Sequence, residues 1–306
     1  MKKLLALLMT GMMTMSMLSA CGTEEVVEEE TTVEVVEEAA EEEVVEEAVE
    51  EEAVEEVAAD VQAIIDAGVL RVGVKNNVVG FGNQDTLTGE YAGLEIELAA
   101  MIAEELGVEV EYTTVTAATR SELLDSGDID CVLATFTITD ERRESWDFTT
   151  PYYTDAVTVL VEDASGITTL ADLVDVTIGV SSGSTSAKSV VEAMVAAGLI
   201  DEASYDAETF DAATWTELVS FRQYDDYPSI STALSAGEVD AFSVDKSILS
   251  IYKTEGRSFI EDNFAPQDYG IATTLGSGMS TLCEELITAW LADGTIDALV
   301  AANGIS

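Results

Sequence analysis

The sequence has no histidine and few basic residues, and both shortages exclude classes of function. Its 306 residues include 12 Lys and Arg against 61 Asp and Glu, for a formal charge of −49 at pH 7. Nucleic acids and anionic membrane surfaces attract Lys and Arg, so neither is expected as a direct binding partner. A histidine-based catalytic base or triad and imidazole zinc ligands are excluded as well. We expect no cofactor and no metal site.

No stretch of the chain is long and apolar enough to span a membrane comfortably, and this includes the apolar run of residues 4–18. That run follows two lysines and ends in Leu18-Ser-Ala-Cys21-Gly22, a secretory signal closing on a bacterial lipobox. We therefore expect residues 1–20 to be a lipoprotein signal peptide and Cys21 to receive the lipid. The alternative is a short transmembrane anchor. On the favoured reading the protein is exported and lipid-anchored on the extracytoplasmic face of the cell membrane.

Cysteine is scarce, with only Cys131 and Cys283 beyond the lipobox. They have no CxxC spacing, so neither a redox motif nor a zinc motif is indicated. Both lie in segments that are typical of a buried strand and a helix face. Two buried free thiols are favoured over a disulfide.

An acidic segment follows the lipobox and has no basic residue. Residues 22–60 contain 18 Glu and Asp60 among Val, Ala and Thr. Like charges four residues apart oppose a helix, and the valines have no core to join. We expect residues 21–60 to be the lipidated cysteine and a disordered tether; a helical stalk is the alternative.

The remaining body alternates strand and helix patterns. Residues 69–74 predict a strand, residues 94–106 have apolar side chains at helical spacing before Gly107, and residues 108–112 and 128–137 predict further strands. Thr119-Arg-Ser-Glu122 has the signature of a capping box opening a short helix. Such alternation indicates βαβ units and a parallel sheet, hence an α/β fold.

Two short patterns recur along the body. Residues 124–135 align with residues 234–245 at an offset of 110, and residues 72–75 align with residues 178–181 at an offset of 106. Because the matches keep their order at nearly equal offsets, they indicate two similar Rossmann-like lobes. Ligands of open parallel sheets bind beyond the carboxyl ends of the strands. We expect four strand ends to surround a shared cleft, namely Lys75, Thr135, Ser181 and Asp245. The alternative is that Lys75 and Asp245 are ordinary surface charges.

The candidate cleft residues are suited to a zwitterion. Arg142 or Arg143 follows a strand end and offers a planar fork for a carboxylate. A Gly/Ser loop at residues 181–186 precedes a helix, whose N-terminus favours an anion. Asp245 supplies a negative charge for an ammonium group.

The cleft also has more positive charge than one α-carboxylate needs. Lys75, Arg120 and Arg142 are three of only ten basic residues in the body, which has a net charge of −32. Arg120 lies in a first helical turn, where the helix dipole disfavours a cation. A second ligand carboxylate explains the excess, so an acidic amino acid is the expected ligand.

These residues carry a family resemblance. The body resembles family 3 extracellular solute-binding proteins of polar amino-acid ABC importers over about residues 62–304. Within the family it is most similar to aspartate/glutamate-binding lipoproteins. The matching stretches are residues 68–74, 93–99, 134–142, 147–153, 234–245 and 269–271.

The resemblance implies roles for eight residues. Arg142 would bind the α-carboxylate with backbone groups of Thr137 and Thr185, and Thr135 and Asp245 would hold the α-amino group. The side-chain carboxylate would be bound by three further residues, Lys75, Arg120 and Tyr227. Glutamine receptors of the family have an Asp at the position of Lys75 and a Lys at that of Ser181, so both departures favour an acidic ligand. Residues 201–223 fit neither branch well.

The family fold implies the periplasmic-binding-protein type II architecture, two lobes joined by a two-strand hinge. Lobe 1 would comprise residues 61–156 and 270–306, and lobe 2 residues 157–269, with crossovers near 153–156 and 265–269. The lobes would close around one ligand. The closed monomer would then dock on a membrane permease that is driven by a cytoplasmic ATPase, with no covalent chemistry.

Two alternatives stay open. A glutamine- or cystine-specific receptor of the same family would share the fold. A periplasmic-binding-fold enzyme, such as a prephenate or arogenate dehydratase, would use a cleft carboxylate, for which Asp245 or Glu95 is the candidate.

Overall fold

The computed structural model describes residues 57–305. The predicted signal peptide, the lipidated Cys21 and almost all of the acidic tether lie outside the described residues. Helix α1 (Ala59–Ala67) begins within the last residues assigned to the tether, and the backbone N–H of Met279 donates to Asp60 at 3.0 Å. Among residues 57–305, no helix has both the length and the apolar character needed to cross a membrane.

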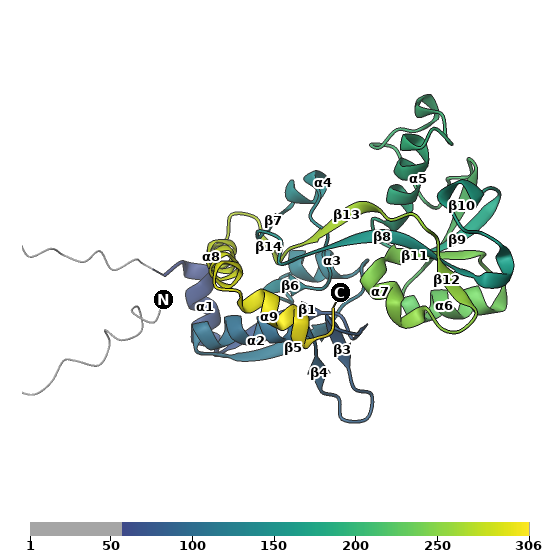
Figure 1. Cartoon of the computed structure of the whole chain (residues 1–306). Helices are drawn as coiled ribbons and strands as arrows, with labels where there is room; N and C mark the ends of the chain where they lie inside the picture. Colours follow the sequence, from purple (N-terminus) through teal and green to yellow (C-terminus); the bar gives the residue numbers. More distant parts are fainter. Residues whose placement is uncertain (1–56, 306) are drawn as a thin grey trace, which may run out of the picture. The chain divides into compact units, whose positions relative to one another are not determined.

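The first lobe is built on a mixed five-stranded sheet (Figure 1). Its strand order is β5 (Glu109–Thr114), β1 (Val69–Val74), β6 (Cys131–Leu133), β14 (Ala272–Thr274) and β7 (Trp146–Phe148). Beside it lies a small antiparallel sheet of β2 (Asn77–Val78), β3 (Gly82–Gln84) and β4 (Tyr91–Ala92). The helices of this lobe are α1, α2 (Leu94–Leu106), α3 (Arg120–Asp125), α4 (Asp140–Arg143), α8 (Gly278–Ala292) and α9 (Thr295–Ala302).

The second lobe has a six-stranded sheet. Its order is β10 (Val219–Tyr224), β9 (Val176–Ser181), β11 (Ala241–Asp245), β8 (Tyr153–Glu162) and β12 (Arg257–Phe259), with β13 (Phe264–Tyr269) also paired to β8. Its α-helices are α5 (Ser186–Ala196), α6 (Tyr227–Ala236) and α7 (Lys246–Leu249). Short 3₁₀ turns are η2 (Asp163–Ser165), η3 (Leu170–Asp172), η4 (Glu202–Ser204) and η5 (Ser250–Tyr252).

Most elements predicted from the sequence are confirmed. Leu94, Leu98 and Ile102 are fully buried along one face of α2, which ends at Gly107 in the left-handed conformation. The strand predicted over residues 128–137 is shorter, because regular pairing in β6 covers only three residues. The prediction of a capping box at Thr119 is wrong. Thr119 has helical backbone angles, and its hydroxyl accepts from the backbone of Thr116 instead of capping α3.

The sequence repeat is a structural repeat. In lobe 1, Asp130 accepts from the backbone N–H of Arg71 at the start of β1, at 2.8 Å. In lobe 2, Asp240 accepts from the backbone N–H of Thr177 at the start of β9, at 2.9 Å. The two lobes therefore anchor their central strands in the same way, as the alignment of residues 124–135 with 234–245 predicts.

Two antiparallel strands, β8 and β13, pass between the lobes (Figure 1). Tyr269 pairs with Tyr153, and an isolated bridge joins Tyr269 to Thr137 of the first lobe.

The prediction of two free thiols is also confirmed: Cys131 and Cys283 are unpaired and fully buried.

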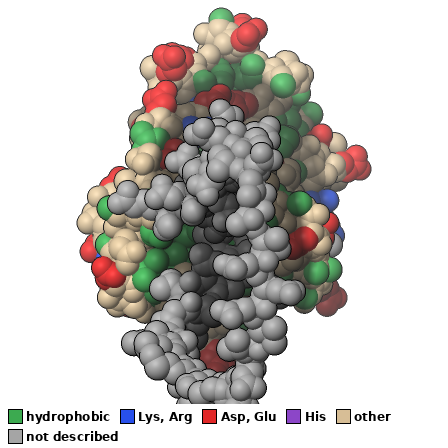
Figure 2. Space-filling view, turned by 90° about the vertical axis from the view of Figure 1, so that its left-hand side faces the viewer, with side chains coloured by type: hydrophobic (Ala, Val, Ile, Leu, Met, Phe, Trp, Pro, Cys, Tyr) green, Lys and Arg blue, Asp and Glu red, His purple; other side chains and the backbone are tan. Residues whose placement is uncertain are grey.

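The surface reflects the excess of acid. The view in Figure 2 shows acidic side chains over several parts of the molecule and few basic ones.

Residues 201–218 form turns around a cluster of Tyr205, Phe210 and Trp215. They precede β10, which pairs in parallel with β9. Most of the 201–223 stretch, which fits neither branch of the family well, is thus held by aromatic packing.

Candidate functional site

Six of the eight predicted ligand residues line one small internal cavity of about 10 Å³, to which both lobes contribute. They are Arg120, Thr135, Thr137, Thr185, Tyr227 and Asp245. Lys75 and Arg142 lie at its margins, through contacts described below. Ser181 is not a lining residue. Its carbonyl accepts from the backbone N–H and hydroxyl of Ser184, so it shapes the loop before α5 instead.

Arg120 is a buried cation in the first turn of α3. Its Nη1 donates to the carbonyls of Ala134 at 2.8 Å and Thr135 at 3.0 Å, and its guanidinium lies 3.9 Å from the Phe136 ring centre. Its Nε is buried without a partner among residues 57–305. Burial lowers the pKa of this guanidinium. A cation in this state favours an anion that can reach it.

Arg142 extends from α4, which the Thr139 hydroxyl caps by accepting from the Arg142 backbone at 3.1 Å. Its Nη1 donates to the Thr137 carbonyl at 2.7 Å, and its Nη2 donates to the Gly183 carbonyl of lobe 2 at 3.1 Å. Burial lowers the pKa of Arg142 to about 9. The guanidinium therefore bridges the two lobes at the margin of the cavity.

Lys75 lies directly after β1 and is 3% exposed. Its Nζ is 5.7 Å from the ring centre of Tyr227, the first residue of α6. Burial, and then the charge of Arg120, lower the pKa of Lys75 well below its ordinary value. Lys75 thus reaches the cavity wall formed by Tyr227, from the opposite lobe.

Asp245 ends β11 and is 5% exposed. Its Oδ2 accepts a hydrogen bond from the hydroxyl of Tyr269, while its Oδ1 is buried without a partner among the described residues. Burial raises the pKa of Asp245 to about 7. The unpartnered oxygen is available to a ligand donor such as an ammonium group.

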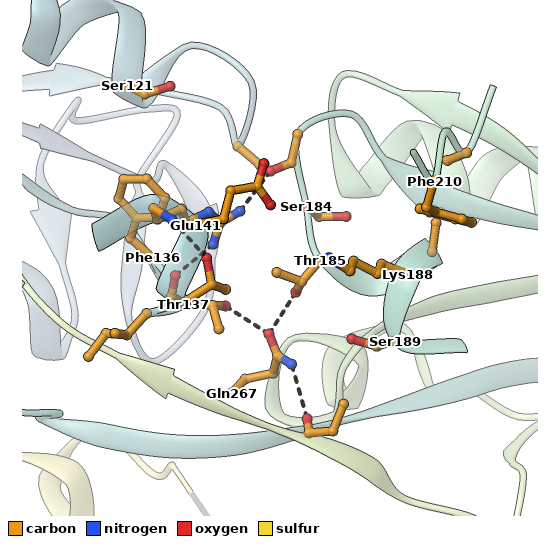
Figure 3. Close-up of a pocket in the computed structure, with 18 of the residues that line it drawn as sticks. Ser121, Phe136, Thr137, Glu141, Ser184, Thr185, Lys188, Ser189, Phe210 and Gln267 are labelled. Atoms are coloured by element: carbon orange, nitrogen blue, oxygen red, sulfur yellow. Dashed lines mark hydrogen bonds between the residues drawn. The ribbon is translucent and has the colours of Figure 1, made fainter. Parts of the chain in front are cut away.

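Gln267 connects the two threonines predicted at the α-carboxylate, and no sequence signal identified it. Its Oε1 accepts from the hydroxyls of Thr137 at 2.8 Å and Thr185 at 2.7 Å. Figure 3 shows these side chains, from opposite lobes, converging on Gln267. The amide of one β13 residue therefore sets the spacing between the lobes at this point.

Glu95, a candidate cleft carboxylate of the enzyme alternative, contacts Thr135 of the predicted ligand site. It is fully buried, and its Oε1 accepts from the Thr135 backbone at 2.5 Å and from the Tyr152 hydroxyl at 2.6 Å. Burial raises its pKa. Thr135 has a φ of 44°, a strained value for a threonine, and this hydrogen bond helps hold it. Glu95 lies in the 93–99 stretch that matches the family, and no pattern in the sequence indicates its contact with Thr135.

A larger groove of about 780 Å³ lies outside the cavity (Figure 3). It shares Thr137 and Thr185 with the cavity and is lined further out by Lys188 and Phe210. At about 10 Å³, the cavity itself is smaller than any amino acid.

Charge and donors together suit a small zwitterion. Three buried or half-buried cations, Lys75, Arg120 and Arg142, face two buried carboxylates, Glu95 and Asp245. None of these cations has a carboxylate within salt-bridge distance among residues 57–305. Within that same range no cluster of His, Cys, Asp and Glu could hold a metal ion.

Comparison with known proteins shows the family. The sequence profile of bacterial extracellular solute-binding proteins, family 3, matches residues 70–304. The chain belongs to this family. Its members are exported, and the resemblance found in the sequence is confirmed at this level.

Relatives in the family are named for different amino-acid ligands. The chain is 30% identical over 231 residues to the ABC transporter glutamine-binding protein of Bacillus subtilis, covering 74% of this chain and 76% of the relative. It is 28% identical over 259 residues to the glutamate-binding protein of Corynebacterium glutamicum, covering 79% and 80%.

A solved structure shares the fold. An ancestral amino-acid-binding protein, described as a precursor of cyclohexadienyl dehydratase, matches with a TM-score of 0.65 at 27% identity, covering 79% of this chain and 98% of that one. The predicted periplasmic-binding-protein type II fold, with two α/β lobes, is therefore correct.

Proposed function

We propose that this chain is the substrate-binding lipoprotein of an amino-acid ABC importer and captures glutamate or aspartate by closure of its lobes. The observation that carries the ligand class is Arg120. It is a buried cation in the same cavity as Asp245, with one donor unpartnered and no carboxylate within salt-bridge distance among the described residues. A ligand carboxylate would give the Arg120 guanidinium the charged partner that it lacks.

The proposal assigns the ligand's amino-acid end first. Arg142 binds the α-carboxylate, with backbone groups of Thr137 and Thr185. Asp245 and Thr135 hold the α-amino group. In support, Asp245 has an oxygen without a partner, and Arg142 lies within hydrogen-bond reach of both lobes.

Lys75, Arg120 and Tyr227 take the side-chain carboxylate in this proposal. With Lys75 protonated and Asp245 and Glu95 ionised, the five charged groups of the site sum to one positive charge. A glutamate or aspartate anion neutralises that charge, whereas glutamine leaves it unbalanced. Because four of these groups, Lys75, Glu95, Arg120 and Asp245, are buried, the imbalance is weakly screened.

The remaining elements of the proposal follow the family resemblance. Lobe 1 comprises residues 61–156 and 270–306, and lobe 2 comprises residues 157–269. Crossovers lie near 153–156 and 265–269, and the antiparallel pairing of β8 and β13 supports this. Lipidation at Cys21 anchors the protein to the membrane through the acidic tether. The monomer delivers its ligand to a permease that a cytoplasmic ATPase drives.

Glutamine is the second candidate ligand, because the Bacillus subtilis relative is named for it. A dehydratase is the remaining alternative, since the ancestral structure is described as a precursor of one.

The test is calorimetric titration of the full chain with glutamate, aspartate, glutamine and cystine. One-to-one submicromolar binding of an acidic amino acid, with glutamine weaker by tenfold or more, would support the proposal. Tighter binding of glutamine or cystine would reject the acidic assignment and keep the transport class. Absence of binding to all four would favour an enzyme.

A further inference from the structure

Tyr269 occupies a position where three parts of the molecule meet. It ends β13, is fully buried, and pairs with Tyr153 of β8. Its carbonyl accepts from the backbone N–H of Tyr152 at 2.9 Å, and its backbone bridges to Thr137 of lobe 1. The backbone of Tyr269 is thus fixed at the junction of the hinge strands and lobe 1.

The side chain of Tyr269 reaches the other lobe. Its ring packs edge-on against Phe81, with centres 5.6 Å apart, and lies 5.9 Å from the ring of Tyr153. Its hydroxyl donates to Oδ2 of Asp245 in lobe 2. One residue therefore joins Thr137 in lobe 1 to Asp245 in lobe 2, and both are candidate ligand residues.

The hydrogen bond determines which oxygen of Asp245 is free. With Oδ2 engaged by Tyr269, Oδ1 is the oxygen left without a partner in the described structure, and Asp245 lines the cavity. A tyrosine that was only filling the core would not need its hydroxyl on a carboxylate. A phenylalanine would pack in the same space.

We propose that Tyr269 is a positioning residue for ligand binding: by donating to Oδ2, it orients the Asp245 carboxylate with Oδ1 toward the ligand's ammonium group. This inference rests on the proposed role of Asp245. It adds that Tyr269, at the end of the hinge strand β13, orients the carboxylate for that role.

The electrostatic surroundings of Asp245 give the inference a pH signature. Burial and the nearby Asp155 of β8 raise the pKa of Asp245, whereas the Tyr269 hydrogen bond lowers it, to the net value of about 7. The charged or titratable groups that face Asp245 are Tyr269 from β13, Asp155 from β8, Arg120 from α3, Arg142 from α4, Tyr227 from α6, and Lys75 after β1.

Removing the hydroxyl raises the pKa of Asp245 further, because the ionised form loses a donor. A larger fraction of Asp245 is then protonated at any given pH near neutrality, and a protonated carboxyl attracts an ammonium less. The affinity for the ligand therefore falls at neutral pH and recovers as the pH rises.

The experiment measures the dissociation constant of the full chain for its tightest-binding amino acid from pH 5.5 to 8.5, by calorimetry. In Tyr269→Phe the loss of affinity toward acid is expected at a pH higher by about one to two units, the scale of a hydrogen bond to a charged group. Tyr153→Phe is the matched control. Its ring belongs to the same cluster, and its hydroxyl makes no hydrogen bond within residues 57–305. The control should keep the wild-type profile.

A Tyr269→Phe profile that overlays the wild type would overturn the inference. Replacing Tyr269 by 3-fluorotyrosine gives a second test that preserves the fold, because the ring and donor stay and the hydroxyl becomes more acidic. The stronger hydrogen bond should shift the profile toward lower pH, and no shift or the opposite shift would contradict the inference.

Asp245→Asn separates this inference from the proposed function. If that variant binds as tightly as wild type, the assignment of Asp245 is wrong and the role of Tyr269 falls with it. If Asp245→Asn loses at least tenfold in affinity while the Tyr269 variants keep the wild-type profile, only the inference about Tyr269 is rejected.

Discussion

Arg142 is the one site cation with hydrogen bonds to both lobes, through Thr137 and Gly183. In the proposed function its fork binds the α-carboxylate that every amino acid carries. We expect Arg142→Ala to weaken binding of all amino acids by about 2–5 kcal/mol, the cost of removing one partner of a buried charge pair. Titration calorimetry would measure it. The neighbouring Arg143→Ala, at an exposed position of the same helix, is the control and should bind normally.

Arg120 should act on one class of ligand only, because it is assigned to the side-chain carboxylate. We expect Arg120→Ala to reduce glutamate affinity by 100-fold or more, about 3 kcal/mol. Glutamine binding should change much less. Parallel titrations with the two ligands measure the difference. Equal losses would show that Arg120 acts by bracing the Ala134 and Thr135 carbonyls, to which it also donates, and not by contacting a ligand carboxylate.

At the scale of elements, the repeated glycines of the central strands have different neighbours. A Cβ on Gly179 of β9 would lie 2.5 Å from Cγ2 of Ile230, which is attached to a stiff, branched carbon. A Cβ on Gly73 of β1 would lie 2.6 Å from Cδ1 of Ile129, the mobile end of its side chain.

We therefore expect Gly179→Ala to lower the free energy of unfolding by about 1–3 kcal/mol, the usual cost of overpacking. Gly73→Ala, as its matched partner in lobe 1, should cost less because Ile129 can rotate away. Urea unfolding of both variants gives the comparison. A larger loss for Gly73→Ala would contradict this reading of the two environments.

The elements show where sequence patterns suffice. Helix α2 follows from its apolar spacing and Gly107, because periodicity reports directly on burial of one face. Thr119 shows the opposite case. Its hydroxyl can accept from the backbone of the helix or from that of the preceding turn, and in the structure it accepts from the backbone N–H of Thr116. No residue pattern distinguishes this turn from a capping box.

The site divides in the same way. Thr135 lies two residues after β6 and Asp245 ends β11, at equivalent positions of the repeat. The topology of parallel sheets gathers strand ends, so the sequence could place them together. Glu95, Gln267 and Tyr269 could not be assigned a role in ligand binding, although Glu95 is a candidate cleft carboxylate of the enzyme alternative. Each is a polar group whose partner lies at least 24 residues away, and nothing local in the chain marks such a pairing.

At the scale of the whole molecule, the lobes approach each other through backbone. A Cβ on Gly183 of lobe 2 would lie 2.8 Å from the Ala117 carbonyl oxygen and 2.8 Å from Cα of Ala118, both in lobe 1. Gly183 also has a φ of 74°, which an alanine adopts only with strain.

We expect Gly183→Ala to hold the lobes apart, which should weaken every ligand by at least tenfold. Small-angle scattering at saturating ligand should show a larger radius of gyration than the wild type. Gly198→Ala is the matched control, because Gly198 has a φ of 71° in the same lobe with open space around its Cβ position. An unchanged radius and affinity in Gly183→Ala would show that this contact does not limit closure.

The buried charges of the site have a consequence for the lifetime of the protein outside the cell. Taking Lys75, Arg120 and Asp245 out of water opposes folding, and a ligand bound as proposed would offset that opposition by pairing with them. Ligand binding then raises the free energy of unfolding in proportion to the logarithm of ligand concentration. Extracytoplasmic proteases act on unfolded chains, so the abundance of this solute-binding protein outside the cytoplasm should rise and fall with the supply of the ligand it binds.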